Sequence, residues 1–330
     1  MKKYVLPEKG NFYKAAMHLH SVLSDGKYEP EQIKKMYMEK GFSIISITDH
    51  EYLYDHSYLS DENFLAITGM ELDTDNEEPG PHCWHKSVHL CLYSKTPHNI
   101  KQVCYHPEFV YCHMDRVDQM EFHGKHYWRL HTVDDINYSI EEANKHGFFV
   151  AYNHPAWNLH RYEEDYKHFK GLWAIEVHNT GSYNDTELEH ESRYDQLLRL
   201  GNKIGVSATD DMHSDFHFNV GWIVVKSPDL KYESVINALL NYEYYASEGP
   251  EIHECYVEDG YVHVKTSPAR RVILRTEGRA TAVAKSADGT DVTEAVLKIP
   301  DNAGRYFRLT VEGHQGKKAW TNAFYLDEVK

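Results

Sequence analysis

The sequence predicts an α/β fold in which a mainly parallel sheet closes into a β/α barrel, followed by a small β-sandwich. Short apolar runs that suit buried strands alternate with helical patterns through the first 250 residues. Polar side chains of the kind that bind ligands stand at the carboxyl ends of several of these strands, where a barrel carries its functional site. After residue 250, turn dipeptides and alternating strands predict the antiparallel sandwich.

The first elements are the clearest. A short strand at 13–17 leads into the segment 18–20. A helix begins at 29–31, with proline in its first turn and acidic residues at the positive end of its dipole, and ends at Gly41. Residues 42–48 are almost continuously apolar, which predicts a strand buried on both faces.

The same alternation continues to residue 242. Further strands are expected at 63–69, 87–92, 148–152, 173–177, 203–208 and 221–225, and helices at 134–146, 184–200 and 232–242. Residues 94–131 are aromatic and rich in histidine and have no clean period, so we expect an inserted lobe over the site. The expected domains are a barrel over 1–250 and a sandwich over 251–330, with strands at 306–311 and 319–326.

Composition excludes several classes of protein. The chain of 330 residues is 41% hydrophobic and carries a formal charge of -16, which argues against binding to a nucleic-acid backbone. The N-terminus lacks an apolar signal segment, and no apolar run reaches membrane-spanning length. The five cysteines are scattered, as is typical of reduced thiols. We expect a cytoplasmic protein with neither nucleic acid nor a membrane as its partner; its oligomeric state stays open.

The segment His18-Leu19-His20 predicts a metal site. Two histidines one residue apart on an extended segment project to the same side, so both can reach one ion. Asp25 follows in a Ser-Asp-Gly turn that can fold its carboxylate back to the same place. Imidazoles and carboxylates together suit Zn, Mn or Fe better than Ca or Mg.

The motifs resemble a known group of proteins. His18-x-His20, Asp25, Thr48-Asp49-His50, Glu71, His89, Asn153-His154-Pro155 and Asp211-x-His213 together resemble the PHP (polymerase and histidinol phosphatase) superfamily. The segments GMELD (69–73), NHPAW (153–157), IEVHNTG (175–181), ATDDMH (208–213) and YYASEGP (244–250), with the β-rich tail, are similar to its CehA/McbA-type branch.

The resemblance implies a distorted (β/α)7 barrel with two or three divalent metal ions. Carried over by position, the implied metal ligands are His18, His20, Asp25, His50, Glu71, His89, His154, Asp211 and His213. Glu71 is the implied bridging carboxylate, and the residues expected to act in catalysis are Asp25, His50, Glu71 and His213. Asp25 stands where some relatives have histidine, and His178 is assigned no role.

These residues allow hydrolysis. Ions bridged by a carboxylate can share a hydroxide, because metal binding lowers the pKa of water from 15.7 to roughly 7. Residues expected to orient the ligands or meet the substrate are Asp49, Asn153, Glu176, Asn179 and Asp210. Candidate contacts for an anionic substrate are Arg161, Arg116, Lys125 and Arg129. The leaving group can take its proton from a metal-bound water or from a histidine of residues 94–131.

The first hypothesis is a metal-dependent phosphoesterase that hydrolyses a small phosphorylated molecule by attack of the bridging hydroxide. The second is a carboxyl-ester or carbamate hydrolase with the same metal centre, which the 25 Tyr, 6 Trp and 12 Phe keep open. The third, from another class, is a non-catalytic metal-containing binding protein. An exonuclease is disfavoured by the acidic charge.

Overall fold

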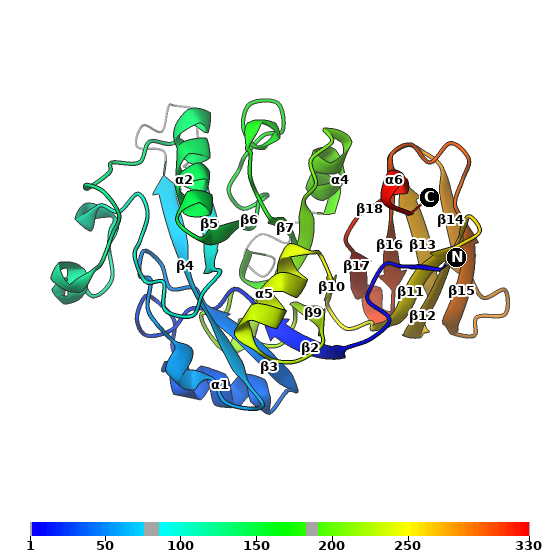
Figure 1. Cartoon of the computed structure of the whole chain (residues 1–330), viewed down its shortest axis with the longest axis horizontal. Helices are drawn as coiled ribbons and strands as arrows, with labels where there is room; N and C mark the ends of the chain where they lie inside the picture. Colours follow the sequence, from blue (N-terminus) through cyan, green and yellow to red (C-terminus); the bar gives the residue numbers. More distant parts are fainter. Residues whose placement is uncertain (1, 76–85, 183–190, 330) are drawn as a thin grey trace.

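One large mixed sheet runs through the molecule, with helices around its N-terminal part (Figure 1). The structure is a computed structural model that describes residues 2–75, 86–182 and 191–329. The strands are β1 (Lys3–Tyr4), β2 (Asn11–Ala16), β3 (Phe42–Ile47), β4 (Leu65–Asp75), β5 (Ser87–Ser94), β6 (Phe148–Tyr152), β7 (Ala174–Asn179), β8 (Gly205–Thr209), β9 (Trp222–Ser227), β10 (Tyr244–Ser247), β11 (Ile252–Glu258), β12 (Tyr261–Ala269), β13 (Arg271–Thr276), β14 (Thr281–Lys285), β15 (Val292–Lys298), β16 (Tyr306–Glu312), β17 (Lys318–Thr321) and β18 (Phe324–Tyr325). The α-helices are α1 (Pro30–Met38), α2 (Val133–Lys145), α4 (Glu191–Arg199), α5 (Tyr232–Leu240) and α6 (Leu326–Val329).

The order of the large sheet confirms an α/β fold but corrects the strand directions. The order is β14-β13-β16-β17-β10-β9-β2-β3-β4-β5-β6-β7-β8. Strands β2, β3 and β4 pair in parallel, as do β6, β7 and β8. Strand β5 is antiparallel to both neighbours, and β9 is antiparallel to β2, so the prediction of a mainly parallel sheet is wrong there. Parallel pairing needs a long crossover, usually a helix, and none is described between β4 and β5.

Hydrogen bonds do not close the sheet into a ring. Strand β8 lies alongside β9 and β10, but no ladder joins it to either one in the described part of the chain. The connection from β8 to β9 is organised by Asp210, whose carboxylate accepts N–H groups from Asn219, Val220 and Gly221. The polar loop thus takes the place of the ladder that would complete a barrel.

Local sequence signals explain the helices. Glu29 forms a capping box with Gln32 at the start of α1, and Ile33 and Tyr37 are buried beneath it. The side chain of Thr132 caps α2. The helix predicted from residue 184 starts outside the described residues; within them, α4 begins at Glu191. The described part of the chain has no helix that is both long enough and apolar enough to cross a membrane.

Residues 94–131 depart from the regular alternation, as expected. They contain 3-10 turns at Pro107–Phe109 and Met114–Gln119 and a single bridge between Gln102 and Phe122. The segment projects from one end of the molecule, at the left of Figure 1. We call it the insertion.

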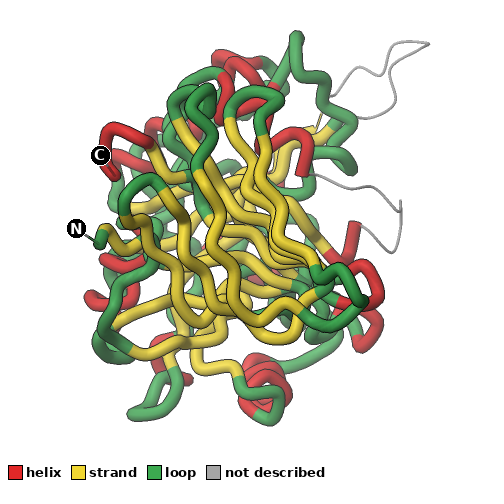
Figure 2. Tube along the Cα trace, turned by 90° about the vertical axis from the view of Figure 1, so that its right-hand side faces the viewer, coloured by secondary structure: helices red, strands yellow, loops and turns green. Residues whose placement is uncertain are grey.

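The C-terminal strands form two packed sheets, which face the viewer in Figure 2. The order β1-β11-β12-β15 forms one sheet, and β13, β14, β16 and β17 continue the large sheet through β10. Because this ladder crosses residue 250, the division into two domains stays a prediction. The single strand expected at 319–326 is wrong: it breaks at Asn322, whose side chain bonds the backbone of Val206, Tyr242 and Tyr244. Four cysteines are free, namely Cys91, Cys104, Cys112 and Cys255, while Cys83 lies outside the described residues.

Candidate metal centre

The His18-x-His20 segment lies in the centre of the site. It continues β2 in an extended conformation, held by a bridge from Leu19 to Met212 and by hydrogen bonds between Leu19 and Thr48. Leu19 is buried in a hydrophobic cluster, so the two histidines face the opposite side. Their Nε2 atoms lie 3.1 and 3.3 Å from Glu71 Oε2 and 3.2 and 3.0 Å from Asp211 Oδ1. The alternation predicted from the sequence therefore directs both rings to one point.

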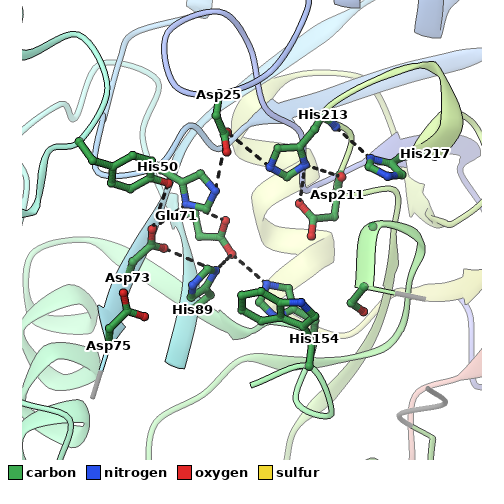
Figure 3. Close-up of a pocket in the computed structure, with 14 residues that line it drawn as sticks. Asp25, His50, Glu71, Asp73, Asp75, His89, His154, Asp211, His213 and His217 are labelled. Atoms are coloured by element: carbon green, nitrogen blue, oxygen red, sulfur yellow. Dashed lines mark hydrogen bonds and ion pairs between the residues drawn. The ribbon is translucent and has the colours of Figure 1, made fainter. Parts of the chain in front are cut away.

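Ligand-type atoms gather in three overlapping groups. Figure 3 shows the members of these groups that line one cavity, namely Asp25, His50, Glu71, Asp73, His89, Asp211 and His213. The groups are His20, Asp25, His50 and His213; His18, His20, Glu71 and Asp211; and His50, Glu71, Asp73 and His89. Within each group the ligand atoms lie within 4.8 Å of one another. Every predicted ligand except His154 belongs to one of them. His154 lies beside them, with Nε2 3.4 Å from Glu71 Oε1.

The Glu71 carboxylate joins the groups. Its Oε2 lies near His18, His20 and His50, while Oε1 lies 3.3 Å from His89 Nδ1. A bridge pairs His50 with Glu71, which brings the end of β3 against β4. This geometry fits a bridging carboxylate.

Unpartnered buried atoms test whether a metal fits. Seven ligand-type atoms are buried without a hydrogen bond although oppositely charged groups are close: His18 Nε2, His20 Nε2, His50 Nδ1, Glu71 Oε2, Asp73 Oδ1, His89 Nδ1 and Asp211 Oδ1. Leaving a buried polar atom unpaired costs about 1–3 kcal/mol. So many unpaired atoms at one place fit a common cationic partner. The residues present therefore fit divalent ions.

Several predicted orienting residues hold these ligands. Glu176 Oε1 lies 2.9 Å from His18 Nδ1, which leaves Nε2 free to bind an ion, and Asn179 donates to Glu176 Oε2 at 2.8 Å. Asn153 donates to Glu71 Oε1. Asp49 accepts from Ser21 and Ser24 in the turn that carries Asp25.

Charge compensation shapes the pKa values of the site in the absence of metal. Burial disfavours the charged form of Asp25, but His213, His20 and His50 outweigh it and hold the pKa of that carboxyl well below its usual range. Burial lowers the pKa of His50, but Asp73 and Glu71 raise it overall to about 9. The same balance raises the pKa of His89 to about 8. Without metal, these histidines hold protons that an ion would displace.

Asp73 was missed in the sequence. It lies in β4 two residues beyond Glu71, on the same face, and pairs across the ladder with His89. Its Oδ2 lies 2.7 Å from His50 Nδ1, and its Oδ1 is one of the unpartnered atoms. Glu71-x-Asp73 has the same spacing as His18-x-His20, and that signal could have identified it.

All members of the groups except His18 and His20 line a cavity of about 400 Å³, and these two histidines lie fully buried behind Glu71 and Asp211. Its lining residues are Asp25, His50, Glu71, Asp73, Asp75, His89, Tyr111, His154, Trp157, Gly181, Ser182, Asp211, His213 and His217. The insertion contributes Tyr111, and none of its histidines lines this cavity as described. The choice between a metal-bound water and a histidine of residues 94–131 as the source of the leaving group's proton stays a prediction.

The basic residues expected to meet a substrate lie elsewhere. Arg161 is 70% exposed and pairs with Glu164, and Lys125 lines a different cavity. Arg116 lies 5.8 Å from the ring of Tyr52. Arg129 is fully buried and pairs with Glu51, which directly follows His50 in the chain. The pair therefore links the insertion to the turn after His50.

No family model matches the chain, and no curated protein matches it. Among solved structures, it is similar to a two-domain protein of Bacteroides vulgatus that contains a predicted PHP-like metal-dependent phosphoesterase, with a TM-score of 0.48, 16% identity and 98% coverage of both chains. It is also similar to a protein of Bifidobacterium adolescentis described as an inferred metal-dependent phosphoesterase (TM-score 0.40, 14% identity, 64% of this chain and 90% of that one). A third is the lesion-specific endonuclease EndoQ of Pyrococcus furiosus (TM-score 0.43, 12% identity, 70% of this chain and 56% of that one). At these levels of similarity, the function of this chain has to be inferred from its own residues.

Proposed function

We propose that the chain is a metal-dependent phosphoesterase that hydrolyses a small phosphorylated molecule. The observation that carries this proposal is the gathering of seven unpartnered buried ligand atoms, five of them on residues that line one cavity and two on His18 and His20, which contact Glu71 and Asp211 of that cavity. The proposal includes two or three ions of Zn, Mn or Fe, a place in the CehA/McbA branch of the PHP superfamily with its distorted (β/α)7 barrel, and an accessory sandwich over 251–330.

The nine ligands inferred from the sequence would hold the ions, with Asp73 as a tenth. Divalent ions there would act as Lewis acids and lower the pKa of a bound water. The chain prepares the site for them: Glu176 fixes the ring of His18, and Asn153 fixes the carboxylate of Glu71. The side chain of Asp25 is 40% exposed, which is more than the side chains of His20, His50 and His213 that it contacts. Asp25 can therefore meet both the ions and the substrate.

The chain also contributes neutral groups at the cavity. The phenol of Tyr111 lies 3.5 Å from Asp73 Oδ2 and lines the cavity. Burial and the charge of Asp73 raise the pKa of Tyr111 far above its usual range, so the phenol stays protonated. It can donate a hydrogen bond to a phosphoryl oxygen at any ordinary pH.

The test is hydrolysis of p-nitrophenyl phosphate, bis(p-nitrophenyl) phosphate and p-nitrophenyl acetate by protein loaded with Mn, Zn or Fe. We expect metal-dependent turnover of at least one phosphate ester. His18→Ala with His20→Ala should lose bound metal and turnover together. Asp211→Asn, which keeps the shape of the side chain, should lose both as well if the double variant folds poorly. His253→Ala with His314→Ala removes two histidines outside the cavity and serves as the control.

Each outcome decides between the hypotheses. Turnover of the acetate alone would replace the proposal with a carboxyl-ester or carbamate hydrolase. Bound metal without turnover of any ester would favour a non-catalytic binding protein. A folded His18→Ala/His20→Ala variant that keeps its metal would refute the metal centre itself.

A further inference from the structure

Histidines are the basic side chains that line the cavity in the described part of the chain. Within residues 2–75, 86–182 and 191–329, no lysine or arginine lines it. The two segments outside this description, 76–85 and 183–190, contain neither residue type in their sequences. A substrate anion would therefore have to be neutralised by metal ions and histidines alone.

Basic residues on segments around the cavity already have acidic partners. Lys86, which precedes β5, has Nζ 2.9 Å from Asp165 Oδ2. Arg129 pairs with Glu51 in the interior, and Arg161 pairs with Glu164 at the surface. None of these can add positive charge to the cavity without giving up its partner.

Carboxylates extend along one wall of the cavity. Glu71, Asp73 and Asp75 alternate along β4, and Figure 3 shows the three side chains in a row. Glu71 and Asp73 belong to the groups of ligand atoms, whereas Asp75 is exposed and belongs to none. Asp75 thus adds an exposed negative charge to the lining of the cavity, and no lysine or arginine of the described residues lines it beside Asp75.

Two aromatic side chains, Tyr111 and Trp157, also line the cavity. Tyr111 is 55% exposed, with its ring 5.6 Å from that of His50. Trp157 is 36% exposed, with its ring 5.2 Å from that of His89 and 4.9 Å from that of His154. The two rings flank different ligand histidines, so an anion at the metal centre would have apolar surface near more than one of its oxygens.

We infer that the site takes a small phosphodiester rather than a phosphomonoester. A monoester is a dianion above its second pKa of about 6. Its extra charge would face Asp75 and would have to be balanced by the metal ions and histidines, because no lysine or arginine lines the described cavity. A diester carries a single charge and two organic groups, which match the absence of lysine and arginine and the two aromatic faces. The formal charge of -16 favours a small diester over a nucleic acid. This inference rests on the proposed function.

The reaction is a hydrolysis and needs no other reactant. The oxygen of a water molecule forms a new bond to phosphorus, and one ester P–O bond breaks. One proton of the water goes to the leaving oxygen directly or through solvent. The products are a monoester and an alcohol or phenol. A monoester product, doubly charged at neutral pH, would be expelled from the site by the same carboxylates.

The experiment compares kcat/KM for bis(p-nitrophenyl) phosphate and p-nitrophenyl phosphate at pH 8 with metal-loaded protein. We expect the diester to be preferred by at least tenfold. Asp75→Lys supplies a lysine at the cavity and should raise the ratio of kcat/KM for the monoester to that for the diester at least tenfold. Asp301→Lys makes the same change in net charge on an exposed carboxylate outside the cavity, and we expect no change in the ratio.

Calorimetry gives a reading that does not depend on turnover. The loaded protein should bind dimethyl phosphate more tightly than inorganic phosphate, and Asp75→Lys should reverse that order. A monoester preference in the parent protein, or an Asp75→Lys variant whose ratio matches that of Asp301→Lys, would overturn the inference and leave the phosphoesterase proposal intact. Absence of turnover with either phosphate ester would overturn both.

Discussion

The buried ion pair between Arg129 and Glu51 should hold the insertion and the metal centre together. Arg129 donates to the carbonyls of Cys104 and Asp73, each at 2.8 Å, and its guanidinium pairs with Glu51. The backbone N–H of Asp73 in turn donates to Glu51 Oε1 at 2.8 Å. One cation thus fixes the backbone of a candidate ligand to the segment that supplies Tyr111.

Arg129→Met should destabilise the fold by about 3 kcal/mol. Removing one partner of a buried pair costs about 3–5 kcal/mol, because the other charge is left uncompensated. Burial, opposed by Arg129, already raises the pKa of Glu51 to about 7, so Glu51 can take up a proton when the arginine is lost. The cost should therefore fall at the lower end of that range.

The sign of the pH dependence follows from the same group. The ordinary pKa of Glu51 is 4.5, and without Arg129 its folded value should rise further, so the native variant binds more protons than the unfolded chain. The free energy of unfolding of Arg129→Met should consequently fall as the pH rises from 6 to 8. The difference in this free energy between the variant and the parent protein should therefore be larger at pH 8.

Urea unfolding of metal-free protein at pH 6 and pH 8 measures these effects. Arg161→Met, which breaks an exposed pair with Glu164, is the control and should cost less than about 0.5 kcal/mol. Glu51→Met with Arg129→Met should recover much of the loss, since apolar residues can replace a buried pair. A loss below about 1 kcal/mol in Arg129→Met, or one equal at both pH values, would refute this reasoning.

Four further outcomes are expected. Asp73→Asn should bind less metal per chain than the parent protein, measured by elemental analysis after dialysis; unchanged stoichiometry would remove Asp73 from the ligands. The raised pKa values of His50 and His89, about 9 and about 8, mean that both histidines hold protons at pH 7. Metal binding should therefore release protons, and the affinity for metal should increase from pH 6 to pH 9. Calorimetry in buffers of different ionisation enthalpy measures both effects, and a pH-independent affinity would contradict this prediction. In the metal-free chain these protonated histidines stabilise the fold below pH 6.5, and that contribution should be lost as the pH rises through 8 to 9. Asn322→Ala should cost about 2–3 kcal/mol in urea unfolding, since it unpairs three buried backbone groups; a loss under about 1 kcal/mol would show that water or rearrangement replaces those bonds.

Most strands and helices could be predicted because their signals are local. The apolar run at 42–48 predicts β3. Pro30 and the acidic residues beside it predict the start of α1, and Gly41 predicts its end. The direction of β5 could not be predicted, because it depends on which strands it meets rather than on its own residues. The break at Asn322 had no local signal either, since its three partners lie far away in the sequence.

The candidate site shows the same division between local and distant information. Period-two alternation predicts that His18 and His20 share a side, and applied to β4 it also places Glu71, Asp73 and Asp75 together. Alternation tells which side of its strand a residue faces, but it does not tell how neighbouring strands are aligned. The bridges from Leu19 to Met212 and from His50 to Glu71 are part of the alignment that brings these ligand side chains together. The positions of basic side chains are harder to predict, because a long side chain can reach several places and pairs with whichever acidic group lies within reach. Arg129 and Lys86 pair with Glu51 and Asp165, so neither adds a positive charge to the described lining of the cavity. The preference for a singly charged substrate that we infer therefore depends on pairings outside the site, which no motif within it encodes.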